Sequence, residues 1–179
     1  MNTLLPSLHP GILAVVYASR AAREPVSVLI AELALLGPLT VLDGGNRFQP
    51  YRVAHLLRQK IVSVDQVARQ VFVRRAFTCY QMQTLLDGTP SLRQPYIVHD
   101  LLATFYDEQV PVHEARRLLE ACLRQVDRLV QFAPVLVTLA PPLLLERTFL
   151  VEMIYARAQH VLIETNPVQP ASQLALFVH

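Results

Sequence analysis

The sequence predicts a single α/β domain built around a mainly parallel β-sheet. Short apolar segments rich in β-branched residues, such as residues 12–17, lack polar alternation and are typical of strands buried on both faces. Segments of helical length separate them, and this alternation favours parallel strands joined by helices on both faces of the sheet. The chain has no internal repeat, low-complexity tract or linker, so residues 1–179 are interpreted as one domain.

Seven strands are expected along the chain. Each is an apolar run that ends at a glycine, a proline or a polar residue. Residues 166–179 are interpreted as a C-terminal strand or tail. Within it, residues 173–178 are the last expected strand. The expected strands are residues 12–17, 39–42, 71–75, 95–100, 134–139, 160–165 and 173–178.

Six helices are expected between these strands. Pro25 and Pro50 favour helix starts, because proline in the first turn removes no intrahelical hydrogen bond. Residues 113–131 give the clearest amphipathic pattern. Residues 143–159 are apolar nearly all round, which predicts a helix that is deeply buried or lies at an interface. The expected helices cover residues 26–36, 51–60, 64–70, 79–86, 113–131 and 143–159.

The composition narrows the class of protein. Hydrophobic residues make up 53% of the chain and charged residues 17%, so some apolar surface is expected to face a partner. A net charge of +2 is too small to indicate nucleic-acid binding by itself. Cys79 and Cys122 have no metal-ligand spacing and favour a reducing, cytoplasmic location. Neither a membrane span nor a secretory signal is expected.

Three segments, in a fixed order along the chain, are similar to motifs of a known family. In the first, Asp43 ends a strand and is followed by Phe48, Pro50 and Arg52, which match a Phe-x-Pro-x-Arg pattern. The second segment, residues 73–86, is built around Arg-Ala-Phe and closes with Leu-Leu.

The third segment, residues 96–106, is similar to a Walker B strand and its exit, with Asp100 as the magnesium-side aspartate. Together the three segments resemble the ATPase core of RecA/RadA-type recombinases, in the archaeal and eukaryotic branch or one of its paralogues. The resemblance covers residues 11–165 and implies a three-layer RecA-like fold of the P-loop NTPase type.

The resemblance also implies an ATP site, and this chain lacks its residues. A phosphate loop needs glycines, a lysine and a Ser or Thr, yet residues 18–25 contain no glycine. The family's Lys-Thr pair falls on Glu24 and Pro25, its catalytic glutamate on Gly45 and its polar sensor residue on Ala140. The chain therefore resembles a degenerate form of this core that lacks the Walker A motif. Neither ATP nor magnesium is expected as a cofactor.

Several charged residues remain as candidates for a residual site. Asp43 and Asp100 are a candidate metal or Walker B-like pair, because carboxylates at strand ends line the ligand crevice of α/β proteins. The alternative is that Asp100 caps the following turn. Arg20 and Arg23 either meet an anion at the helix start or lie on a solvated loop. His99 is expected to face away from Asp100 and to be packed rather than catalytic.

A stripe of arginines is a candidate contact with nucleic acid. Arg117, Arg124 and Arg128 share one face of the helix at residues 113–131, at a spacing that can follow a phosphate backbone. The alternative is a solvated face in which Glu120 pairs with arginines one helical turn away.

These observations lead to one main hypothesis and two alternatives. The chain is interpreted as a noncatalytic RecA-like protein, a pseudo-ATPase, that acts as a partner or regulatory subunit in DNA recombination or repair. It is expected to form homo-oligomers or to bind an active RecA-like ATPase. The alternatives are a nucleic-acid-binding accessory that uses the arginine stripe, and a residual nucleotide- or metal-dependent phosphohydrolase at Asp43 and Asp100.

Overall fold

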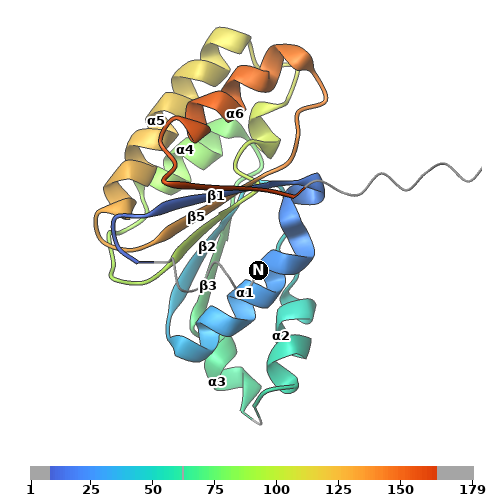
Figure 1. The fold of residues 1–179 in the computed structure, drawn as a ribbon, viewed down its shortest axis with the longest axis vertical. Helices are drawn as coiled ribbons and strands as arrows, with labels where there is room; N and C mark the ends of the chain where they lie inside the picture. Colours follow the sequence, from blue (N-terminus) through green and yellow to red (C-terminus); the bar gives the residue numbers. More distant parts are fainter. Residues whose placement is uncertain (1–8, 62, 165–179) are drawn as a thin grey trace, which may run out of the picture.

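The computed structural model describes residues 9–61 and 63–164 and confirms the predicted α/β class. Six strands form one sheet in the order β3-β2-β4-β5-β1-β6, and every strand pairing is parallel. Helices cover both faces of the sheet, an arrangement consistent with a three-layer RecA-like fold (Figure 1). The strand expected at residues 173–178 and the C-terminal segment 166–179 lie outside the described residues.

Six of the predicted strands are present. The four inner strands are almost entirely buried, which explains why their sequences lack polar alternation. The two edge strands, β3 and β6, are more exposed. The strands are β1 (Leu13–Ala18), β2 (Leu39–Asp43), β3 (Val71–Arg75), β4 (Tyr96–His99), β5 (Val135–Leu139) and β6 (His160–Glu164).

The helices form two layers, with α1, α2 and α3 below the sheet in Figure 1 and α4, α5 and α6 above it. Each layer has its own apolar core. Along β1, Leu13 and Val15 belong to the α4–α6 core, whereas Ala14 and Val16 belong to the α1–α2 core. The helices are α1 (Arg23–Leu36), α2 (Pro50–Arg58), α3 (Val64–Ala68), α4 (Cys79–Asp87), α5 (Val112–Val130) and α6 (Thr148–Tyr155).

The helix predicted at residues 143–159 is wrong in its first part. Helix α6 begins only at Thr148, after a 3₁₀ turn at Leu145–Arg147, and Leu143 is 98% exposed. Pro141 and Pro142 stand just before this segment, and proline removes a backbone donor and disfavours helix in the residue before it. The apolar side chains that suggested an all-round buried helix therefore lie partly in an exposed connection.

A buried arginine fixes the neighbouring connection between β4 and α5. The side chain of Arg147 is 2% exposed and donates to the carbonyl oxygens of Phe105 (3.3 Å), Asp107 (3.2 Å) and Val110 (2.6 Å). One cation thus satisfies three backbone acceptors of an irregular segment, and this stabilises a connection that has few backbone partners of its own.

The described residues contain no helix that is both long enough and apolar enough to cross a bilayer.

Candidate functional site

The candidate site lies at the carboxyl edge of the sheet, where two adjacent strands end in carboxylates. Asp43 is the last residue of β2, and Asp100 directly follows β4. The two strands pair in register, with Asp43 beside His99. Both carboxylates are fully buried, so the structure brings together the pair that was proposed from the sequence. Their partners decide what this pair can bind.

The carboxylate of Asp43 holds the loop that follows its own strand. Its two oxygens accept from the backbone N–H groups of Arg47 (2.9 Å) and Phe48 (3.1 Å), and Oδ2 also accepts from Nε of Arg75 (3.1 Å). A buried carboxylate with two backbone donors and one guanidinium is neutralised locally. Asp43 therefore acts as the anchor of residues 44–48.

The carboxylate of Asp100 is paired with an arginine from that same loop. Oδ2 of Asp100 accepts from Nε of Arg47 at 3.0 Å, while its Oδ1 is buried without a hydrogen-bond partner among the described residues. The backbone N–H of Asp100 donates to Oγ1 of Thr138 on β5 (2.9 Å), and its φ of 53° turns the chain sharply away from the sheet. The side chain thus meets a guanidinium instead of capping a turn.

Arg47 is the centre of the site. Its backbone N–H binds Asp43, its guanidinium binds Asp100, and its carbonyl oxygen accepts from Nε of Arg23 on α1 (3.3 Å). One residue therefore ties together the ends of β2 and β4 and the start of α1. The sequence analysis did not single out Arg47. One feature of the sequence could have indicated Arg47. It lies in the loop that follows Asp43, and a buried carboxylate pair requires a neighbouring cation.

Two glycines pack directly on Asp100. A Cβ atom at Gly45 would lie 2.4 Å from Oδ2 of Asp100, and one at Gly44 would lie 2.8 Å from the Asp100 carbonyl oxygen and 2.6 Å from Cε of Met82. Side-chain carbons do not approach other atoms this closely, so neither position accepts a larger residue without a shift of Asp100. A catalytic glutamate at position 45 does not fit this geometry.

A tight turn joins β1 to α1, in the segment where the resemblance implied a phosphate loop. Only Ser19–Ala22 separate β1 from α1, and Arg20, Ala21 and Ala22 have left-handed backbone conformations with φ between 52° and 54°. Ala21 and Ala22 are buried, whereas Arg20 is exposed. A loop that cradles phosphates presents a series of free backbone N–H groups around an anion. A turn of only four residues, two of them buried alanines, leaves little room for such a cradle.

The other charged residues of this segment are directed to α2 and its preceding loop. Glu24 forms an ion pair with Arg52 on α2, with Oε2 and Nε 3.0 Å apart. Arg23 donates to the carbonyl oxygen of Arg47, and with the amide of Gln49 reoriented it also donates to that side chain. Of the three loop residues proposed from the sequence, only Arg23 joins the Asp43–Asp100 site.

The residues present do not fit a magnesium nucleotide. Asp43 and Asp100 are each paired with an arginine, Gly45 is pressed against Asp100, and the turn before α1 is closed. Within residues 9–61 and 63–164, no group of three or more His, Cys, Asp or Glu side chains is placed to hold a metal. The site is a network of ion pairs and hydrogen bonds that joins the ends of the two strands.

His99 lies beside this network in a buried position. Its imidazole is 1% exposed, and within the described part of the chain neither ring nitrogen has a partner at hydrogen-bond geometry, although the backbone of Ala21 lies near the ring. Burial lowers the pKa of His99, while the carboxylates of Asp43 and Asp100 and the backbone of Ala21 act in the opposite direction. The neutral imidazole is therefore the form that the folded protein favours.

This lowered pKa predicts acid sensitivity. The unfolded chain takes up a proton on His99 below about pH 6.5, but the folded protein resists it, so the free energy of unfolding should decrease from about pH 6.5 toward the lowered pKa. His99→Leu should lose less stability than the wild type over that interval, as measured by urea unfolding at a series of pH values. The exposed His55 is the control, and His55→Gln should keep the wild-type dependence. An unchanged dependence in His99→Leu would contradict this assignment.

The left-handed turn predicts a stabilising substitution. Arg20 has a φ of 54°, a conformation that costs a non-glycine residue about 1–2 kcal/mol, whereas glycine adopts it freely. Glycine also loses more chain entropy than arginine on folding, and this offsets part of the relieved strain. Arg20→Gly should therefore raise the free energy of unfolding by about 0.5–1 kcal/mol. Arg124→Gly, at an exposed position inside α5, should lower it by about 1 kcal/mol. Chemical denaturation of both variants tests the pair, and destabilisation by Arg20→Gly would refute the expected strain.

The proposed arginine stripe lies on α5, in the helix layer opposite α1. Arg117 pairs with Glu114 through two hydrogen bonds of 2.7 and 2.8 Å. Arg128 is partly buried and donates to the carbonyl oxygens of Leu86 (3.2 Å) and Thr89 (2.8 Å). Arg124 is exposed. The stripe therefore contains two exposed arginines, Arg117 and Arg124, of which Arg117 is paired with an acid, and a third, Arg128, that holds the segment after α4.

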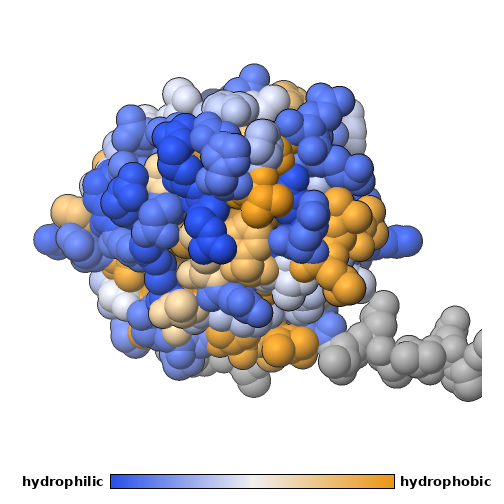
Figure 2. All heavy atoms as spheres, turned by 90° about the horizontal axis from the view of Figure 1, so that it is seen from above, coloured by the Kyte–Doolittle hydropathy of each residue, from blue (hydrophilic) through white to orange (hydrophobic). Residues whose placement is uncertain are grey.

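The surface of this layer is mixed in character. Figure 2 looks onto the molecule from the side of α4–α6 and shows hydrophilic groups interrupted by apolar patches. Arg116 covers one apolar group, since its guanidinium carbon lies 4.4 Å from the ring centroid of Phe149.

No protein-family model and no curated protein matches this chain. The fold and the geometry of its carboxyl edge are therefore the basis for the functional proposal.

Proposed function

We propose that the protein is a noncatalytic RecA-like subunit that acts by binding other proteins. The observation that carries this proposal is the Arg47 bridge, because it places a guanidinium on the carboxylate that a magnesium ion would need. Arg75 does the same for Asp43, and the closed turn before α1 removes the phosphate cradle. The residues of the site thus stabilise the fold, and the surface is left to provide the function.

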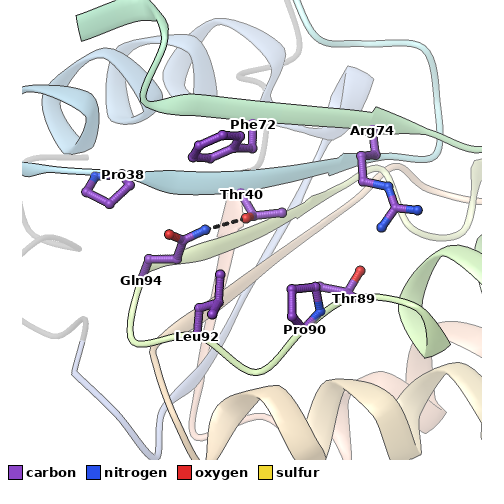
Figure 3. Close-up of a pocket in the computed structure, with 8 residues that line it drawn as sticks. All are labelled: Pro38, Thr40, Phe72, Arg74, Thr89, Pro90, Leu92 and Gln94. Carbon is purple, nitrogen blue, oxygen red and sulfur yellow. Dashed lines mark hydrogen bonds between the residues drawn. The ribbon is translucent and has the colours of Figure 1, made fainter.

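An open apolar pocket beside edge strand β3 supports a role in protein binding. The pocket has a volume of about 450 Å³ and lies between β2, β3 and the segment that joins α4 to β4. Figure 3 shows Phe72 and Leu92 facing this space, and Gln94 held across its floor by a 2.7 Å hydrogen bond to Thr40. Arg74 lies at one end. An apolar side chain followed by an acidic residue fits this arrangement.

The resemblance to RecA/RadA-type recombinases supports the choice of partner and setting. Under this proposal the protein docks on an active RecA-like ATPase in DNA recombination or repair, and it regulates that ATPase without hydrolysing nucleotide itself. The pocket beside β3 offers an apolar anchor on an exposed surface, and Arg74 at its end can receive an acidic side chain.

The first experiment tests the lost nucleotide site. Titration calorimetry with Mg-ATP up to millimolar concentration is expected to show no binding to the wild type. Binding in the micromolar range that Asp100→Asn abolishes would refute the proposal and favour a residual phosphohydrolase. Asp100→Asn has a direct control in Glu24→Gln, because Glu24 is exposed and pairs with Arg52 outside the network.

The second experiment tests the partner. Binding of an intact RecA-like ATPase to the immobilised wild type is expected, and Phe72→Asp should weaken it by at least about tenfold, since it places a charge in an apolar pocket. Phe132→Asp is the matched control, because Phe132 is also exposed but lies outside this pocket. Equal loss in both variants, or no binding by the wild type, would contradict this partner.

A further inference from the structure

The edge of the sheet formed by β6 has an unusual composition. Within the described residues β6 pairs only with β1, and all five of its residues are exposed although three are the apolar Val161, Leu162 and Ile163. Ile163 is 55% exposed. An edge strand offers a row of unpaired backbone N–H and C=O groups, and proteins usually protect such edges with lysine, proline or a bulge. Strand β6 contains no lysine, proline or glycine.

The opposite edge provides the contrast. Strand β3 carries Arg74 and Arg75 in its last two positions, and Arg75 is turned inward to Asp43. Charged residues on an edge strand disfavour pairing with a second strand. The two edges of one sheet thus differ, and only β6 presents an uninterrupted apolar centre.

The sequence of β6 is self-complementary. It reads His-Val-Leu-Ile-Glu, with Leu162 at its centre. When two such strands pair antiparallel about Leu162, His160 of one copy stands opposite Glu164 of the other, and Val161 stands opposite Ile163. Opposed residues in an antiparallel pair lie on the same face, so both ends gain an imidazole–carboxylate contact and the centre gains apolar pairs.

The register with β1 shows which surfaces such a pair covers. Val161 lies beside Val15, and Ile163 lies beside Tyr17, so both face the α4–α6 side of the sheet. Leu162 lies beside Val16 on the α1 side. Antiparallel pairing would extend each apolar core past the edge of its own sheet and cover side chains that are exposed in the single chain.

We propose that two copies of this chain associate by antiparallel pairing of their β6 strands, which joins the two six-stranded sheets into one. The charge complementarity of His160 with Glu164 and the lack of protecting residues identify a second copy as the occupant. Five residues per strand make a small interface, so the dimer is weak and forms in about the micromolar range. This proposal is independent of the lost nucleotide site and of the β3 pocket.

Sedimentation velocity of the full chain over a concentration series tests the interface. The wild type is expected to shift from monomer to dimer, and Ile163→Lys should raise the dissociation constant by at least about tenfold, because it places a charge in the apolar centre of the edge. Tyr51→Lys is the control, since Tyr51 on α2 is 90% exposed and lies outside both β6 and the β3 pocket, so association should be unchanged. Thermal unfolding verifies that both variants are folded.

A charge exchange identifies the occupant. His160→Glu places two carboxylates opposite each other and should weaken the dimer, whereas His160→Glu combined with Glu164→Lys should restore it to within about threefold of wild type. Restoration requires that residue 160 of one copy faces residue 164 of another. A chain that stays monomeric at every concentration, a dimer that Tyr51→Lys weakens equally, or a double variant that stays as weak as His160→Glu would overturn the proposal. The first of these results would favour residues 165–179 of the same chain as the occupant of this edge.

Discussion

Replacing Arg47 with methionine is expected to lower the free energy of unfolding by about 3 kcal/mol. The substitution keeps most of the aliphatic stem but leaves Asp100 as a buried carboxylate without its cation. Loss of one partner from a buried ion pair costs about 3–5 kcal/mol, and the lower end applies because the Arg47 side chain is 37% exposed, so that water can partly replace it. Equilibrium unfolding in urea measures the effect.

A double-mutant cycle separates this pairing from general disruption of the loop. Arg47→Met combined with Asp100→Asn removes both charges, so its effect should be smaller than the sum of the two single effects by at least about 1 kcal/mol. Arg52→Met is the control, because the Arg52–Glu24 pair is exposed and such pairs contribute about 0–1 kcal/mol. Strict additivity in the cycle would show that Arg47 and Asp100 do not stabilise each other.

Replacing Arg147 with methionine is expected to destabilise the fold by about 3–5 kcal/mol. The guanidinium is buried and donates to three backbone carbonyl oxygens, of which those of Phe105 and Val110 would lose this partner, whereas that of Asp107 still accepts from the backbone N–H of Val110 (3.1 Å). Each buried acceptor left unpaired costs about 1–3 kcal/mol, and local rearrangement recovers part of this sum. Hydrogen exchange should also show faster exchange of the amides in residues 101–111, which this side chain holds in place.

Two variants define the role of Arg147 more closely. Arg147→Lys keeps the charge but has a single ammonium in place of the planar fork, so it should recover only part of the stability. Arg117→Met removes an exposed arginine with an i,i+3 pair and should leave stability nearly unchanged. Equal effects of Arg147→Met and Arg117→Met would contradict the importance of the buried contacts.

The fold class could be predicted from the sequence because strand and helix signals alternate clearly. The inner strands are short, β-branched and apolar, and prolines and glycines separate them from the helices. The segment 143–159 misled the prediction, since apolar residues suggested one long buried helix. In the structure, the chain after Pro142 exposes Leu143 and forms only a 3₁₀ turn at Leu145–Arg147, and helix α6 begins at Thr148. Hydrophobicity alone does not distinguish a buried segment from an exposed one.

The two carboxylates of the candidate site could be predicted from the sequence, but the arginines that pair with them could not. Asp43 and Asp100 follow from their positions at strand ends, because carboxyl ends of parallel strands meet at one edge. Their pairing with Arg75 and Arg47 depends on the path of two loops and on side-chain rotamers, which no local pattern encodes. The same holds for Arg128, whose contacts with the segment after α4 arise only from tertiary packing.

The contact between Gly45 and Asp100 has an evolutionary consequence. A mutation that adds a side chain at position 45 collides with Asp100, and a mutation that displaces Asp100 leaves Arg47 without its partner. Each single substitution at position 45 or 100 therefore lowers stability unless a second change compensates for it. The two positions are bound to change together, whereas exposed positions elsewhere on the surface can change one at a time with little effect on stability.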